Sequence, residues 1–192
     1  MTNKQPKISS LPSTDFHLHV INHPERMFVM FTHSKGKLFT PDWLIRLAMK
    51  WRYGGKISEM FSHCGMVFNE GRKAMFYHQT YPTFKRKEWG TRPYSIGLEI
   101  TDPEAVAFAK EKCIELNEAR RGYGVGQLLT FVFTIWFKWM NNPITKGKVC
   151  SEAVAACFPQ WITTDKDNTD PYQAYIQLKP HAEKEYRVYQ ND

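Results

Sequence analysis

Cysteine is scarce in this sequence, and its few copies show no regular spacing. Cys64, Cys113, Cys150 and Cys157 are spread over a chain of 192 residues, and no two of them form a CxxC pair. Disulfide-stabilised scaffolds and structural zinc sites both need closer and more regular cysteines. We therefore expect reduced thiols, and neither a disulfide framework nor a zinc site.

The sequence also lacks a long hydrophobic run and an apolar leader. The opening residues, MTNKQPKISSLPSTDF, are polar and rich in Ser and Pro, so nothing marks them for secretory cleavage. The most apolar stretch is VGQLLTFVFTIWFKWM at 125–140, which is shorter than the ~20 residues that span a bilayer and carries polar interruptions. We expect it to be a buried helix; a helix lying on a membrane surface, and so a peripheral membrane contact, is the less favoured alternative.

These absences set the expected organisation. With 192 residues, of which 42% are hydrophobic, the chain can bury one sizeable core. We expect a flexible tail over 1–15 and a single domain over 16–192. We expect the protein to be cytoplasmic, or to be delivered as a phage or virion component.

Negative charge is in deficit. The chain has 26 Lys and Arg against 19 Asp and Glu, a net charge of +7. This excess favours nucleic acid, anionic lipid or cell-wall polymers without choosing among them. Because no nucleic-acid motif accompanies the small basic clusters at 85–87 and 120–121, we expect no specific nucleic-acid partner. The oligomeric state stays open.

Histidine is concentrated near the start of the chain, at His17, His19, His23 and His33. No carboxylate stands at ligand spacing around the segment HLHVINH, so we expect no metal there. No cofactor-binding motif is found in the sequence, and we expect no cofactor.

What the sequence does contain is a set of short apolar runs bounded by turn and capping residues. Alternation and β-branched or aromatic residues predict strands, and apolar residues at helical spacing after Thr-Pro or Asp-Pro predict helices. The residues EGRK at 70–73 predict the turn of an antiparallel hairpin. We expect strands over 26–32, 62–69, 74–80 and 94–100, and helices over 40–53, 102–122, 125–140 and 149–158. The order predicts an α+β fold: a small antiparallel sheet first, then helices packed against it.

Cys150 stands at the start of a predicted helix, where cysteine chemistry is favoured. Unpaired backbone N–H groups at a helix N-terminus stabilise a thiolate, and a neighbouring imidazole lowers the thiol pKa further. Ser151 and Glu152 follow in the first turn, and the N–H groups there are candidates to hold an oxyanion. The pattern indicates a nucleophilic cysteine.

Two histidines in the predicted hairpin are candidates for the rest of a catalytic triad. His63 is the candidate general base. His78 lies on the paired strand and is the candidate that orients it, while a register shift of one residue would put Gln79 in that role.

The segments SHCGMVF at 62–68 and VCSEAVAA at 149–156 resemble motifs of a known family. They are similar to those of circularly permuted papain-like cysteine peptidases and amidases of the NlpC-type superfamily. The resemblance is to the YiiX/YaeF-like branch, which includes lecithin:retinol acyltransferase relatives, and it spans about residues 26–160. Ser62, His63 and Gly65 match the histidine motif, His78 falls at the polar third position, and Cys150, Ser151 and Glu152 match the cysteine motif.

The resemblance implies a permuted papain-like fold and a thiol hydrolase with a Cys150–His63–His78 triad. The substrate it implies is an amide bond in peptidoglycan peptides, cut through an acyl-enzyme. A lipid esterase or acyltransferase of the same branch is the second possibility. A non-catalytic structural protein, such as a virion component that keeps the fold, is an alternative of another class.

The sequence departs from the family pattern at two places. Glu25 and Arg26 stand where Gly-Asp usually opens the first strand. Cys64 follows the histidine where a small or β-branched residue is common. Because neighbouring residues on a strand face opposite ways, we expect Cys64 to affect packing alone.

Overall fold

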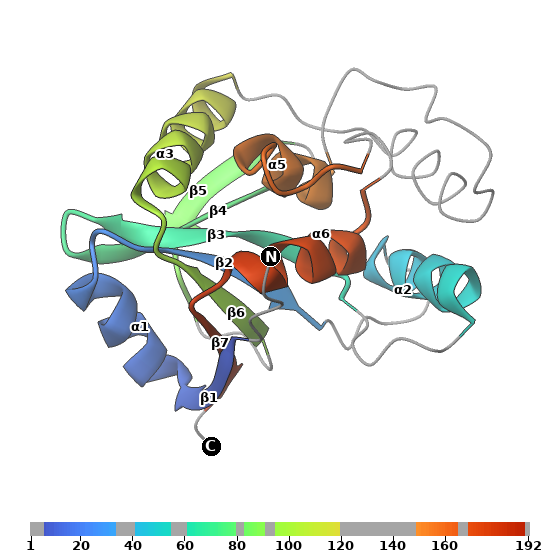
Figure 1. The fold of residues 1–192 in the computed structure, drawn as a ribbon, viewed down its shortest axis with the longest axis horizontal. Coiled ribbons are helices and arrows are strands. Elements are labelled where there is room, and N and C mark those ends of the chain that lie inside the picture. The colour runs from blue at the N-terminus through green and yellow to red at the C-terminus, as the bar shows by residue number, and fades with distance from the viewer. Residues whose placement is uncertain are drawn as a thin grey trace.

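The computed structural model describes residues 6–33, 41–54, 61–79, 83–90, 95–119, 149–164 and 169–190. These residues form an α+β protein in which helices cover a mixed, mostly antiparallel sheet (Figure 1). The strands are β1 (Lys7–Pro12), β2 (Met27–Thr32), β3 (His63–Glu70), β4 (Lys73–Gln79), β5 (Phe84–Glu88), β6 (Ser95–Ile100) and β7 (Lys184–Tyr189). The helices are α1 (Ser13–Asn22), α2 (Pro41–Tyr53), α3 (Pro103–Glu118), α5 (Cys150–Cys157) and α6 (Pro171–Leu178), and the 3-10 turn η2 (Lys179–His181) follows α6.

The seven strands form one sheet in the order β1-β7-β6-β2-β3-β4-β5. Every neighbouring pair is antiparallel except β1 and β7, which run parallel. At its centre, β2 pairs with both β3 and β6. Its sequence MFVMFT is apolar up to Thr32 and wholly buried, as is typical of a strand that is covered on both faces.

The two faces of the sheet carry separate cores. Helices α3, α5 and α6 pack on one face, against alternate β2 side chains such as Val29 and Phe31. Helix α1 packs on the other face, where Phe16 and Val20 meet Phe28 (Figure 1). Side chains that alternate along β2 therefore contribute to two apolar cores, one on each face of the sheet.

Most of the predicted elements are confirmed, with ends displaced by a residue or a few. The hairpin of β3 and β4 pairs as predicted, with Glu70 opposite Lys73. Helix α3 begins as its Asp-Pro signature indicates, because the Asp102 carboxylate accepts the Ala105 N–H at 2.8 Å. The predicted helix over 125–140 lies outside the described residues, as does Thr40, the threonine of the Thr-Pro signal that precedes α2. Within the described ranges, no helix is both long and apolar enough to cross a membrane.

The predicted N-terminal tail over 1–15 is wrong for residues 7–15. Lys7–Pro12 is a strand, and α1 begins at Ser13. The segment KISSLP shows no alternation of burial because it is an edge strand, whose backbone pairs with β7 while side chains such as Ile8 stay exposed. The predicted α+β class and the mostly antiparallel sheet are confirmed, but the sheet is larger than expected and mixed, since β1, β5 and β7 were not predicted and the β1–β7 pair is parallel.

Candidate active site

The hairpin of β3 and β4 brings two of the predicted site residues together. Its two-residue loop, Gly71-Arg72, has positive φ at both positions, 55° and 70°, a conformation whose twist suits antiparallel strands. Across the hairpin, the His63 Nε2 and His78 Nδ1 atoms lie 2.8 Å apart, a hydrogen-bond distance. His78, not Gln79, is therefore the residue of β4 that contacts His63.

Gly65 makes room for this contact. A Cβ atom at position 65 would lie 2.7 Å from the His78 Cβ, 2.7 Å from a Phe76 ring carbon and 2.7 Å from the Tyr77 carbonyl oxygen. Real Cβ atoms do not approach so closely, so only glycine lets β4 present His78 at this distance from β3. The sequence motif includes Gly65, but only the pairing of β3 with β4 shows why a glycine is needed at this position.

The His78 ring is held in a fixed orientation. The side chain is buried, and the Phe76 ring stacks on it with centroids 4.3 Å apart and an interplanar angle of 20°. The hydrogen bond to His78 uses Nε2 of His63, which leaves Nδ1 as the ring nitrogen available to another partner. His63 can therefore exchange a proton at Nδ1 while the hydrogen bond at Nε2 holds its ring in place.

Cys150 is the first residue of α5, as the sequence predicts. Val149 precedes it in extended conformation, and the Glu152 carboxylate accepts the Val149 N–H at 2.8 Å. This bond gives the helix a cap at its start. The Glu152 side chain thus has a structural role, and the Ser151 side chain is fully buried. What remains for an oxyanion is the backbone N–H groups of the first turn.

The pKa of the Cys150 thiol lies well below its usual range. Hydrogen bonding to the Cys64 thiol is the main cause; burial opposes it, and the charge and hydrogen bonding of His63 lower the pKa further. Burial raises the pKa of Cys64 well above its usual range, and the interaction with Cys150 adds to the increase. Of the two thiols, Cys150 is therefore the one that ionises more readily.

Cys64 corrects the expectation that it would affect packing alone. The reasoning about alternation holds, because Cys64 belongs to the core on the α5 face of the sheet. Helix α5 packs on β3 at this face, and the Cys64 thiol interacts there with Cys150, the first residue of the helix. The sequence could not reveal this neighbour, because it depends on where α5 crosses the strand.

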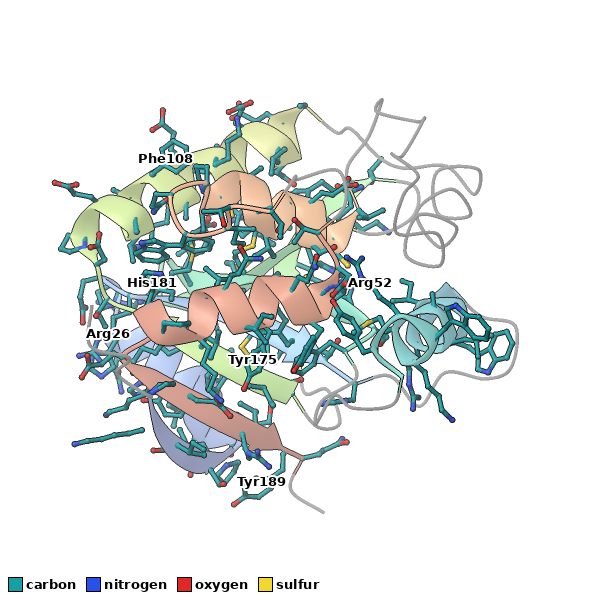
Figure 2. The ribbon with its side chains drawn as sticks, turned by 45° about the vertical axis from the view of Figure 1, so that its right-hand side comes forward. Arg26, Arg52, Phe108, Tyr175, His181 and Tyr189 are labelled. Carbon is teal, nitrogen blue, oxygen red and sulfur yellow. The ribbon has the colours of Figure 1, made fainter. Side chains whose placement is uncertain are left out.

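A polar cluster that sequence reasoning missed borders these thiols. The fully buried Asp170 carboxylate caps α6 by accepting the Gln173 N–H at 2.8 Å. It also accepts the Tyr53 hydroxyl at 2.7 Å and pairs with Arg52 at 3.4 Å. Figure 2 shows Arg52 where the end of α2 faces the start of α6.

The negative charge of Asp170 also affects the Cys64 thiol. It contributes to the raised pKa of Cys64, and burial raises its own pKa against the effect of its hydrogen-bond donors. The Asp170-Pro171 pair repeats the cap signature of residues 102–103, so sequence reasoning could have found the cap but not its contacts with α2.

The remaining two cysteines form a separate pair. The Cys113 and Cys157 sulfur atoms lie 3.9 Å apart between α3 and α5, and both residues are fully buried. Burial raises the pKa of Cys113 well above its usual range. All four cysteines are free thiols, arranged as one pair at the histidines and one in the apolar core.

One of the N-terminal histidines, His19, lies against a different buried group, the Glu99 carboxylate. His19 contacts the Glu99 carboxylate at 3.4 Å and the Tyr186 hydroxyl at 3.0 Å. Arg26 also pairs with Glu99. Arg26 stands at one of the two positions where the family that the sequence resembles has Gly-Asp. These bonds join α1 and the start of β2 to the sheet. Across the part of the chain that the structure describes, no group of three or more His, Cys, Asp or Glu side chains is arranged to hold a metal ion.

Comparison with known proteins identifies no family for this chain. No model of a known protein family matches the chain, and no curated protein matches it as a relative.

Proposed function

We propose that this protein is a thiol hydrolase with a permuted papain-like fold, which cuts an amide bond through a Cys150–His63–His78 triad. The observation that carries the proposal is the 2.8 Å contact between His63 and His78, next to a helix-start cysteine whose thiol pKa is lowered. An oriented imidazole beside an activated thiol is the arrangement of a nucleophilic cysteine site. The buried pair Cys113 and Cys157 lacks this arrangement.

In the proposed reaction, His63 moves the protons. It takes the Cys150 proton at Nδ1, while its Nε2–H donates to Nδ1 of His78 and keeps the ring in position. The Cys150 thiolate attacks the carbonyl carbon, and the first-turn N–H groups of α5 stabilise the oxyanion. His63 then protonates the amine as the C–N bond breaks, which leaves a thioester on Cys150. A water molecule, deprotonated by His63, hydrolyses the thioester and frees the enzyme.

The proposed substrate is a peptide of the bacterial cell wall. The resemblance of the two motifs favours this class, and a net charge of +7 suits an encounter with the anionic wall. The lipid alternative depended on the stretch 125–140, which lies outside the described residues, so we propose amide hydrolysis.

Digestion of purified peptidoglycan tests the proposal. The protein should release fragments with a new amino group and a new carboxyl group, identified by mass spectrometry. Cys150→Ser should release none, because a hydroxyl ionises far less than a thiol beside the same imidazole. The matched control Cys113→Ser removes a thiol of the core pair and should keep the activity. Undiminished release by folded Cys150→Ser would overturn the mechanism.

A further inference from the structure

A cavity of about 370 Å³ lies where the start of helix α1 meets the end of strand β5. It is lined by Ser13, Thr14, His17, Leu18 and Trp89. The first four residues belong to the first turns of α1, and Trp89 directly follows β5. Thr14 and Leu18 are exposed, so the cavity is reached from solvent. Its volume lies within the range of roughly 300–1,000 Å³ that small-molecule sites occupy.

Two hydrogen-bonding groups of the cavity lining have no partner. The Ser13 and Trp89 side chains are buried, with exposed fractions of 2% and 4%. Within the part of the chain that the structure describes, neither Ser13 Oγ nor Trp89 Nε1 meets a hydrogen-bond partner. Buried polar atoms are nearly always paired, because an unpaired atom has lost its bonds to water without compensation. The indole N–H can only donate, and the serine hydroxyl can also donate. A ligand that accepts hydrogen bonds would therefore suit this lining.

The start of α1 favours negative charge on such an acceptor. The first N–H groups of a helix have no partner within the helix, and the helix dipole adds partial positive charge at this end. Pro12, the residue before α1, makes no side-chain cap hydrogen bond. Asp15 is the acidic residue of the first turn, and it is not among the described residues that line the cavity. A carboxylate therefore fits this lining better than a neutral acceptor.

The rest of the lining is apolar or aromatic. The Trp89 ring packs edge-on against Phe16 and Phe76, with centroids 6.1 Å and 5.1 Å away, which fixes its orientation. Leu18 supplies aliphatic surface, and His17 supplies a second ring. Aromatic rings pack favourably against each other in edge-to-face or offset arrangements. A small flat apolar group therefore suits the body of the ligand.

We propose that this cavity binds a small aromatic carboxylate. The carboxylate accepts hydrogen bonds from Ser13 Oγ and Trp89 Nε1, and the aromatic ring packs against Leu18 and the Trp89 indole. The proposal does not require the hydrolase reaction, because the described lining residues include neither Cys150 nor the two histidines of the candidate active site.

Titration of the whole protein with phenylacetate, followed by the NMR signals of the tryptophan indole N–H groups, tests the proposal. The Trp89 signal, identified by its loss in Trp89→Phe, should shift saturably as its N–H gains an acceptor. The Trp161 signal should not shift, because Trp161 packs against Phe158 in the core on the other face of the sheet. A Trp89 signal that does not respond to millimolar phenylacetate would overturn the site.

The neutral analogue phenylacetamide tests the class of ligand. It keeps the ring and a carbonyl acceptor but lacks the charge. It should bind about tenfold more weakly than phenylacetate, because hydrogen bonds to a charged acceptor are roughly twice as strong as those to a neutral one. Equal affinity for the two compounds would overturn the carboxylate assignment.

Two variants remove one donor each. Ser13→Ala and Trp89→Phe should each weaken phenylacetate binding by about tenfold, measured by equilibrium dialysis. Ser13→Ala should also keep the unfolding midpoint of the wild type, because the hydroxyl it removes has no described partner. The matched controls Ser10→Ala, at an exposed position of β1, and Trp161→Phe should bind as the wild type does. Unchanged affinity in either donor variant would contradict the assigned contacts, and Ser13→Ala decides the question if Trp89→Phe does not fold.

Discussion

At the scale of single residues, we expect His78 to influence the candidate site through its contact with His63. The Nδ1 atom of His78 lies at hydrogen-bond distance from Nε2 of His63, and the described hydrogen bonds include none between His78 and Cys150. His63→Ala should lower kcat/KM by roughly 10²–10⁴-fold, because it removes the base. His78→Ala should cost less, about tenfold, because it removes only the positioning partner of the base. His78→Gln keeps an acceptor and should recover part of the loss.

The adjacent residue provides the control for this series. Gln79 is also buried in β4 but does not contact His63 in the described hydrogen bonds, so Gln79→Ala should keep the His63-dependent activity. Steady-state kinetics on the cleaved peptide measures all four variants. Full activity in His78→Ala together with a loss in Gln79→Ala would contradict the assignment of the orienting residue.

The pH dependence of Cys150 depends on Cys64. Because the pKa of Cys150 is lowered, its thiolate should persist below the pH of about 8.5 at which ordinary thiols ionise, and should be lost as the pH falls through the lowered value. Cys64→Ala removes the first cause of the lowering, so the loss should move to higher pH. The rate of Cys150 alkylation by iodoacetamide, measured against pH with peptide mapping, checks this shift. Cys113→Ala should leave the profile unchanged, and an unchanged profile in Cys64→Ala would show that the Cys64 thiol does not stabilise the thiolate.

At the scale of elements, the approach of β4 to β3 depends on Gly65. Gly65→Ala places a methyl group 2.7 Å from the His78 Cβ and from the Tyr77 carbonyl, atoms that cannot move without the strand. It should destabilise the fold by about 1–3 kcal/mol and slow Cys150 alkylation, because His78 is displaced from His63. Denaturant unfolding and alkylation rates measure the two effects.

Gly97 offers a matched control on β6. A Cβ there would meet the Met30 sulfur at 2.9 Å, and a flexible methionine side chain can move aside. Gly97→Ala should therefore destabilise the fold less and leave the alkylation rate of Cys150 unchanged. A wild-type alkylation rate in Gly65→Ala would show that this glycine does not position His78.

The start of helix α5 depends on the Glu152 cap. Glu152→Ala leaves the Val149 N–H without its described acceptor inside the protein, which should cost about 1–3 kcal/mol. Glu152→Gln keeps an acceptor oxygen and should lose less. Urea unfolding measures both. Asp102→Ala removes the cap of α3 instead, with an expected cost of about 1 kcal/mol and no change in Cys150 alkylation, since this cap lies at another helix. Equal stability of Glu152→Ala and the wild type would show that the Glu152 carboxylate does not stabilise the start of α5.

At the scale of the whole molecule, the sheet needs cover on both faces. Phe16 of α1 is fully buried against Phe28 and Tyr186, with ring centroids 5.2 Å and 6.0 Å away. Phe16→Ala should lower the free energy of unfolding by about 3–5 kcal/mol. Leu18→Ala on the same helix removes a side chain that is 57% exposed and should change stability by less than about 0.5 kcal/mol. Denaturant unfolding compares them, and equal small losses would mean that α1 does not seal this face.

The sequence by itself determined the elements whose signals are local. The turn around Gly71, the Asp102-Pro103 helix start and the apolar run of β2 are encoded within a few residues, because caps, turns and alternation act between near neighbours. The same locality placed His63 on a strand beside His78 and Cys150 at a helix start.

Only the tertiary structure decided which distant residues meet. The pairing of Lys7–Pro12 with Lys184–Tyr189 joins opposite ends of the chain by backbone hydrogen bonds, which leave no side-chain pattern in an edge strand. The placing of Cys64 beside Cys150, and of Asp170 beside Tyr53, depends on how α5 and α6 pack on the sheet and on α2. Such contacts follow from the packing of whole elements, and no short stretch of sequence contains both partners.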